Sequence, residues 1–111
     1  VGALIMVIID LLIDPVAVHG LEIWIWDDKG FYYDIPIHNF LGWFFLSIPL
    51  IILFSFFDYK IHKFSRLTSI AIISFFVIIG IINGLILASF IGILTITFNF
   101  LHYYKYNAKK L

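Results

Sequence analysis

Three long apolar runs dominate the pattern of hydrophobic and polar positions along the chain. The first covers residues 1–18, and the second covers residues 39–57 without a single charged side chain. A helix needs roughly 20 apolar residues to cross a bilayer, so each of these runs predicts one membrane helix. Pro49 lies inside the second run and predicts a kink, because neighbouring groups can satisfy the carbonyl that a proline leaves free.

The third run, residues 67–101, is too long for one upright helix. As a single helix it would measure about 52 Å, whereas the hydrocarbon core of a bilayer is about 30 Å thick. Asn83-Gly84, a dipeptide typical of turns, stands at its middle. The run therefore predicts two helices, at about 68–82 and 85–101.

These elements predict an all-α fold, a polytopic membrane helical bundle in one domain. Composition agrees, since 63% of the 111 residues are apolar and 13% are charged, against about 25% charged in a typical soluble domain. The chain starts inside an apolar run at Val1, so we expect the C-terminal part of a longer membrane protein. About four membrane helices are expected, at 1–18, 39–57, 68–82 and 85–101, with an interfacial loop at 19–38.

Charge predicts the orientation of the helices and excludes some functions. Seven basic residues balance seven acidic ones, which argues against binding to nucleic acid, and the absence of cysteine excludes thiolate chemistry. Loop 19–38 carries four acids and one lysine, and we expect it to form an ordered cap on the outer side of a cell membrane. Two basic clusters flank the third run and are expected on the cytoplasmic side: Lys60, Lys63 and Arg66, then Lys105, Lys109 and Lys110.

Asp10 and Asp14 are the sharpest chemical feature, because carboxyl groups inside a membrane helix are rare and costly. At a spacing of four residues they share one helix face, where both could not ionise at low cost. One of them would then keep a proton near neutral pH and could donate it. The structural alternative is that Asp14 caps a helix that starts at Pro15, and that Asp10 pairs with a Lys or Arg in the part of the protein expected to precede this sequence.

The aromatic residues near the predicted helix ends have two interpretations. They form an interfacial belt, or they form a wall of π faces around an apolar polyene or a transient carbocation. The side chains concerned are Trp24, Trp26, Tyr32, Tyr33 and Trp43.

Other patterns argue against metal or diphosphate chemistry. His19 and Glu22 have helical spacing, but no second ligand pair lies near them, so no metal site is expected. Asp27-Asp28 resembles the start of a diphosphate-binding motif, but Phe31 stands where that motif needs an aspartate. Asn39 is expected to cap the second membrane helix.

Two blocks of sequence resemble a known family. The first is Asp-Leu-Leu-Ile-Asp-Pro at 10–15, followed by Gly20 and by Trp-Ile-Trp at 24–26. The second is Gly-Phe-Tyr-Tyr-Asp-Ile-Pro-Ile-His-Asn-Phe-Leu-Gly-Trp-Phe at 30–44. Both are similar to the integral-membrane carotenoid biosynthesis proteins, a family that includes hydratases of the bisanhydrobacterioruberin hydratase type. The family usually has glycine where Asp34 stands.

The resemblance implies that water adds across a terminal double bond of an acyclic carotenoid, by acid catalysis and without a cofactor. Asp10 or Asp14 would be the catalytic acid, and the other would orient water. The expected partners are the lipid bilayer, the carotenoid and other enzymes of the pathway. The alternative is a non-catalytic membrane protein, such as a transporter segment or an assembly subunit. The residues expected to bind substrate are Trp24, Trp26, Tyr33, Asn39 and Trp43.

The hairpin predicts that both basic clusters lie on one side of the membrane. In this cysteine-free chain, Lys63→Cys and Lys109→Cys should react with an impermeant thiol reagent from the same side. Labelling of the two cysteines from opposite sides would contradict the hairpin.

Overall fold

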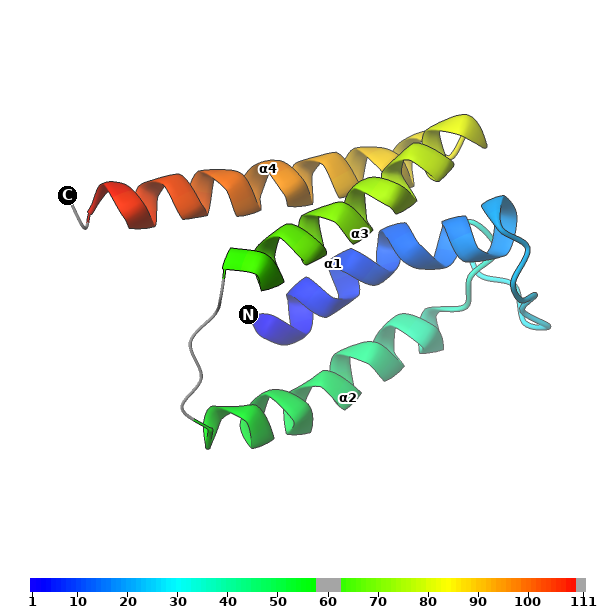
Figure 1. Ribbon diagram of the computed structural model, residues 1–111. Helices are drawn as coiled ribbons and strands as arrows, with labels where there is room; N and C mark the ends of the chain where they lie inside the picture. The colour runs from blue at the N-terminus through cyan, green and yellow to red at the C-terminus, as the bar shows by residue number, and fades with distance from the viewer. Residues whose placement is uncertain (58–62, 110–111) are drawn as a thin grey trace.

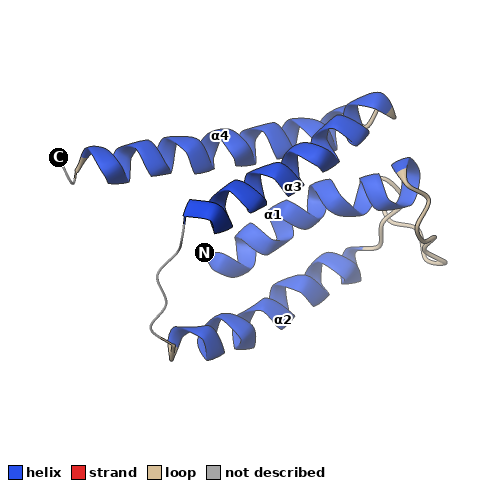
Figure 2. Ribbon diagram, in the orientation of Figure 1, coloured by secondary structure: helices blue, strands red, loops and turns tan. Residues whose placement is uncertain are grey.

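The computed structural model describes residues 1–57 and 63–109, and most of these residues are helical (Figures 1 and 2). Four helices are long and apolar enough to cross a membrane, which confirms the all-α membrane bundle. Lys60 and Lys110 of the two basic clusters lie outside the described residues. The helices are α1 (Gly2–Pro15), continued by the π-helical turn η1 (Val16–Gly20), then α2 (Ile37–Ser55), α3 (Lys63–Ile82) and α4 (Ile86–Ala108).

Helix α1 is the centre of the bundle. It packs against α2 on one side and against the α3–α4 hairpin on the other (Figure 1). The start of α3 and the end of α4 lie at one end of the bundle, while loop 21–36 lies at the opposite end. The arrangement therefore places Lys63 and Lys109 at the same end, away from the acidic loop.

The long apolar run turns where Asn83-Gly84 predicts it. Gly84 adopts a left-handed φ of +72°, and the Leu85 N–H donates back to the Gly80 carbonyl at 2.8 Å. This geometry is a common way to end a helix, and glycine adopts it without a steric penalty. The helices on either side are longer than the apolar pattern predicts. The polar flanks 63–67 and 102–108 also continue the helical hydrogen bonding, although they carry charge.

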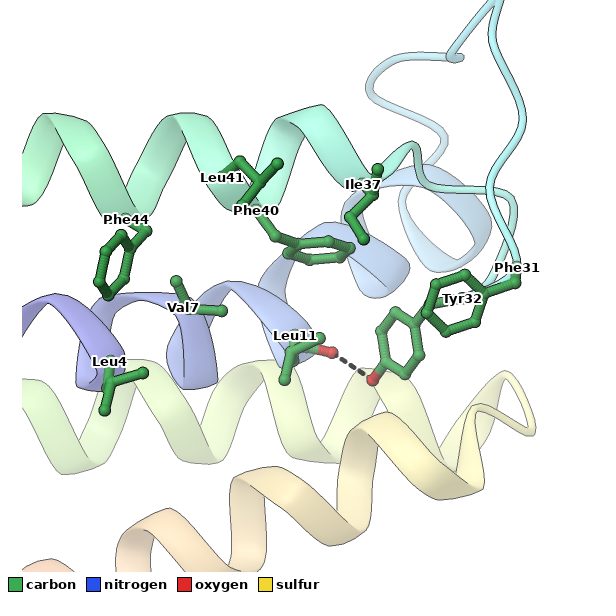
Figure 3. Close-up of a pocket in the computed structure, with 9 residues that line it drawn as sticks. All are labelled: Leu4, Val7, Leu11, Phe31, Tyr32, Ile37, Phe40, Leu41 and Phe44. Carbon is green, nitrogen blue, oxygen red and sulfur yellow. Dashed lines mark hydrogen bonds between the residues drawn. The ribbon is translucent and has the colours of Figure 1, made fainter.

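The prediction that Asp14 caps a helix is wrong, because the helix runs through Asp14-Pro15 without a break. A proline inside a helix has no N–H for the carbonyl four residues earlier, which here belongs to Leu11. The Tyr32 hydroxyl donates to that carbonyl at 2.6 Å and replaces the missing partner (Figure 3). Burial and the neighbouring Tyr33 raise the pKa of Tyr32, so this hydroxyl keeps its proton.

The contact between α1 and the α3–α4 hairpin depends on small residues. A Cβ atom at Gly92 would lie 2.4 Å from a methyl group of Val77 and 2.8 Å from one of Leu12. Glycine thus lets α4 approach both neighbours closely, as is common between membrane helices. Leu12, Val16 and Ala88 are almost completely buried in this contact, which fixes one face of α1.

Loop 21–36 folds back over the bundle through three kinds of contact. Tyr32 reaches α1, its ring packs edge-on against Phe40 of α2, and the Tyr33 hydroxyl accepts from the Leu87 N–H of α4 at 3.1 Å. The loop therefore contacts α4 as well as α1 and α2. Asp34 has a φ of +61°, a left-handed conformation that suits the glycine usual in the family and that aspartate tolerates.

Gly30 lets two segments of this loop meet. A Cβ atom there would lie 1.9 Å from the Ile35 carbonyl oxygen, a backbone atom that has little room to move. We therefore expect Gly30→Ala to open the loop and to speed the hydrogen exchange of the amides of Trp24 to Tyr33.

Gly42→Ala is the matched control, because among the described residues no atom beyond the surrounding helix backbone lies within 4 Å of a Cβ at that position. It should leave exchange in the loop unchanged and raise helix stability by up to about 1 kcal/mol. Loop exchange in Gly30→Ala as slow as in the wild type would contradict the packing described above.

Candidate functional site

The two aspartates of α1 form a buried pair that one side chain of α2 bridges. Asp10 and Asp14 are 8% and 2% exposed. The Asn39 side-chain amide donates to Oδ2 of Asp10 and to Oδ2 of Asp14, both at 2.7 Å. An asparagine amide nitrogen carries two hydrogens, so each carboxyl group receives one of them.

Helical geometry sets up this arrangement. The aspartates are four residues apart, so they lie one above the other on the same face of α1. Asn39 is in the first turn of α2, a helix that begins after Pro36 and has no side-chain cap. The prediction that Asn39 caps this helix is therefore wrong: its amide is directed at α1 instead of its own backbone.

The loop adds two indole groups to the site. Trp24 and Trp26 bring their indole N–H groups near the Asp14 carboxyl. The Trp26 Nε1 atom is buried and forms no hydrogen bond of ordinary geometry within residues 1–57 and 63–109. Asp14 is the carboxyl group that lies near this N–H. The edge of the Trp26 ring also meets His38, with ring centroids 6.0 Å apart.

The remaining predicted site residues lie away from this centre or at its border. The Tyr33 hydroxyl accepts a hydrogen bond from the Leu87 N–H at the start of α4. The centroids of the Tyr32 and Tyr33 rings lie 4.9 Å apart. Trp43 follows Asn39 by one helical turn and is 39% exposed. The structure thus brings together Asp10, Asp14, Asn39, Trp24 and Trp26, and leaves Tyr33 outside this group.

An apolar groove of about 310 Å³ runs between α1 and α2 beside the carboxyl pair (Figure 3). Val7 and Leu11 line this groove. Val7 precedes Asp10 by three residues and Leu11 precedes Asp14 by three, so each lies next to an aspartate on the surface of α1. Sequence reasoning missed this groove, because its residues look like ordinary lipid-facing side chains. The lining residues are Leu4, Val7, Leu11, Phe31, Tyr32, Ile37, Phe40, Leu41 and Phe44.

Polar side chains gather at a second hollow, on the loop side of α1. The His19 Nε2–H donates to the Tyr33 carbonyl oxygen at 2.7 Å, and the same nitrogen lies 4.0 Å from Oδ2 of Asp34. Glu22 and Lys29 line the same hollow. Within the described ranges, no three His, Asp or Glu side chains converge as metal ligands.

Comparison with known proteins identifies the family. Residues 1–99 match the family model described as carotenoid biosynthesis protein, whereas no curated protein and no solved structure matches the chain. The match includes α1, the loop, α2, α3 and most of α4, and with them every residue of the candidate site. This chain is therefore a member of the carotenoid biosynthesis protein family, with four helices of membrane-spanning length.

Proposed function

We propose that this protein hydrates a terminal carbon–carbon double bond of an acyclic carotenoid by acid catalysis, in the cell membrane. The observation that carries the proposal is the carboxyl pair, buried in an apolar helix and joined by one amide. An ionised aspartate at the centre of a membrane helix costs about 2.5–3.5 kcal/mol on insertion scales. Two carboxyl groups this close therefore favour a state that retains one proton.

That shared proton supplies the first chemical step. A carboxylic acid transfers its proton to the CH carbon of a trisubstituted alkene, and the electron pair of the double bond forms the new C–H bond. The other alkene carbon becomes a tertiary cation. Water adds to this cation, and the second carboxyl group takes the proton that the water loses. The product is a tertiary alcohol, and the reaction involves no net oxidation or reduction.

The apolar groove is a suitable seat for the hydrocarbon chain. All nine of its lining residues are apolar or aromatic. A chain in the groove would run past Val7 and Leu11, beside the carboxyl pair. The faces of Tyr32, Phe40 and Phe44 would stabilise a cation formed there, because an aromatic face attracts positive charge.

A non-catalytic role is the second interpretation, and one observation favours it. The two hydrogen bonds of Asn39 join α1 to α2, so the carboxyl pair could serve helix packing alone. The same pair would then matter for the stability of the α1–α2 contact and not for the pigment that the cell makes.

Substitution of each aspartate distinguishes the two interpretations. Asp10→Asn and Asp14→Asn nearly keep the size of the side chain but remove the transferable proton. We expect both variants to insert into the membrane, and loss of the true donor to lower hydration by about 10²- to 10⁴-fold. The measurement is the mass of the pigments made by the full-length protein in a host that produces lycopene.

Asp28→Asn is the matched control, because Asp28 is an exposed aspartate of the loop. It should hydrate the carotenoid at the wild-type rate. Wild-type hydration in both Asp10→Asn and Asp14→Asn would refute the carboxyl pair as the acid. Loss of membrane-inserted protein, with normal hydration per molecule, would favour the packing role.

A further inference from the structure

We propose that the end of the α3–α4 hairpin opposite loop 21–36 binds the headgroup phosphate of an anionic phospholipid, with Arg66 at the centre of the site. Three lysines lie toward the same end of the bundle: Lys63, Lys105 and Lys109 (Figure 1). This inference goes beyond the proposed hydration, because it concerns the other end of the molecule and does not depend on the reaction at the carboxyl pair.

Positive charge without a counter-charge marks this end of the hairpin. Residues 63–109 carry four basic side chains and no aspartate or glutamate. The acids that the structure describes are the pair inside α1 and the four acids of loop 19–38, at the opposite end of the bundle. Asp58 lies outside the described residues, and one carboxylate balances only one of four cations. Most of the counter-charge therefore has to come from another molecule.

Arg66 is held by a contact between the two helices of the hairpin. Its guanidinium carbon lies 4.6 Å from the centre of the Tyr103 ring of α4. The arginine is half-buried, its Nη1 atom is buried without a hydrogen-bond partner, and it forms no ion pair within residues 1–57 and 63–109. A buried cationic donor without an acceptor is costly. Arg66 thus offers unsatisfied donors on a side chain that Tyr103 already orients.

Asn99 is the nearest internal acceptor to consider, since it precedes Tyr103 by one helical turn. Its Oδ1 atom is also buried without a hydrogen-bond partner among the described residues. The arginine and the asparagine therefore do not bond to each other through these atoms. A neutral amide oxygen would in any case leave the charge of Arg66 unbalanced, so an anion is the better partner.

The position of the site selects a phospholipid as that anion. Helices α3 and α4 are long and apolar enough to cross a membrane, so their basic end lies at a membrane surface, where lipid phosphates are. Exposed tyrosines at this end of α4 are typical of side chains at headgroup level. Basic pockets between membrane helices bind anionic headgroups, and a planar guanidinium pairs with phosphate through two parallel hydrogen bonds. The tyrosines are Tyr103, Tyr104 and Tyr106.

Native mass spectrometry of the full-length protein tests the site without relying on activity. The protein in detergent is titrated with phosphatidylglycerol or with phosphatidylcholine that has the same acyl chains. We expect tighter binding of phosphatidylglycerol. Arg66→Gln should weaken it about 10- to 100-fold, the factor for a hydrogen bond to a charged group. Lys105→Gln removes attraction at a distance and should weaken it only about fivefold.

Conservative variants keep the test decisive if Arg66→Gln does not fold. Arg66→Lys keeps the charge but loses the planar pair of donors, so it should bind phosphatidylglycerol less tightly than the wild type does. Tyr103→Phe keeps the ring under the guanidinium and should bind as the wild type does. Tyr103→Leu removes the ring and should weaken binding about two- to fivefold.

Lys29→Gln is the matched control, because it removes one positive charge from the loop at the opposite end of the bundle. It should bind phosphatidylglycerol as the wild type does. Equal affinity for the two lipids, or the same small loss in Arg66→Gln as in Lys29→Gln, would overturn the proposal. Displacement of the lipid by an equal concentration of inorganic phosphate would show that the site takes the free anion, and would overturn the assignment to a phospholipid.

Discussion

The sharing of one amide nitrogen by two carboxyl groups is the interaction on which the rest of the site depends. Asn39 is the partner that α2 supplies to Asp10 and Asp14, and its two hydrogen bonds tie α2 to α1 at the level of the aspartates. Without a donor, two carboxyl groups inside an apolar helix would be costly to bury. With one donor between them, they can be held close together and share a proton, as the proposed acid catalysis requires.

A second interaction, between Tyr32 and the Leu11 carbonyl, connects the loop to this site. Pro15 deprives that carbonyl of its helical partner, and the Tyr32 hydroxyl takes its place. This hydrogen bond holds the loop against α1, and the same loop brings Trp24 and Trp26 near Asp14. On the other face of α1, the close approach at Gly92 holds the helix against the α3–α4 hairpin. Asp14 therefore supplies a carboxyl group to the site, and Pro15 next to it leaves free the carbonyl to which the loop binds through Tyr32.

The elements that depend on local patterns could be predicted from the sequence. The lengths of the apolar runs indicate four membrane helices, and Asn83-Gly84 marks the turn of the hairpin. The pairing of Asp10 and Asp14 follows from their spacing. The helix ends are less well predicted, because charged residues such as Lys63 and Lys105 continue a helix beyond its apolar part.

Contacts between distant segments could not be predicted. Asp14-Pro15 has the local signature of a helix start, but the helix continues, and the hydroxyl of Tyr32, 21 residues from Leu11, binds the carbonyl that Pro15 leaves without a partner. Asn39 has the local signature of a cap, but its acceptors lie 25 and 29 residues earlier. The groove could not be predicted from the sequence for the same reason, since its apolar residues resemble those that face lipid. In these cases prediction from the sequence fails because the fold must first bring the donor and its acceptor together before their pairing can be recognised.

Isotope labelling of the product tests the central claim most directly, because the account assigns both the new hydrogen and the new oxygen to water. The full-length protein would be incubated with an acyclic carotenoid in D₂O or in H₂¹⁸O, and the product analysed by mass spectrometry. Acid-catalysed hydration predicts one deuterium on the carbon beside the new tertiary alcohol, and one ¹⁸O in its hydroxyl group. An oxygen that does not come from water, or an alcohol with no deuterium on the neighbouring carbon, would contradict the account.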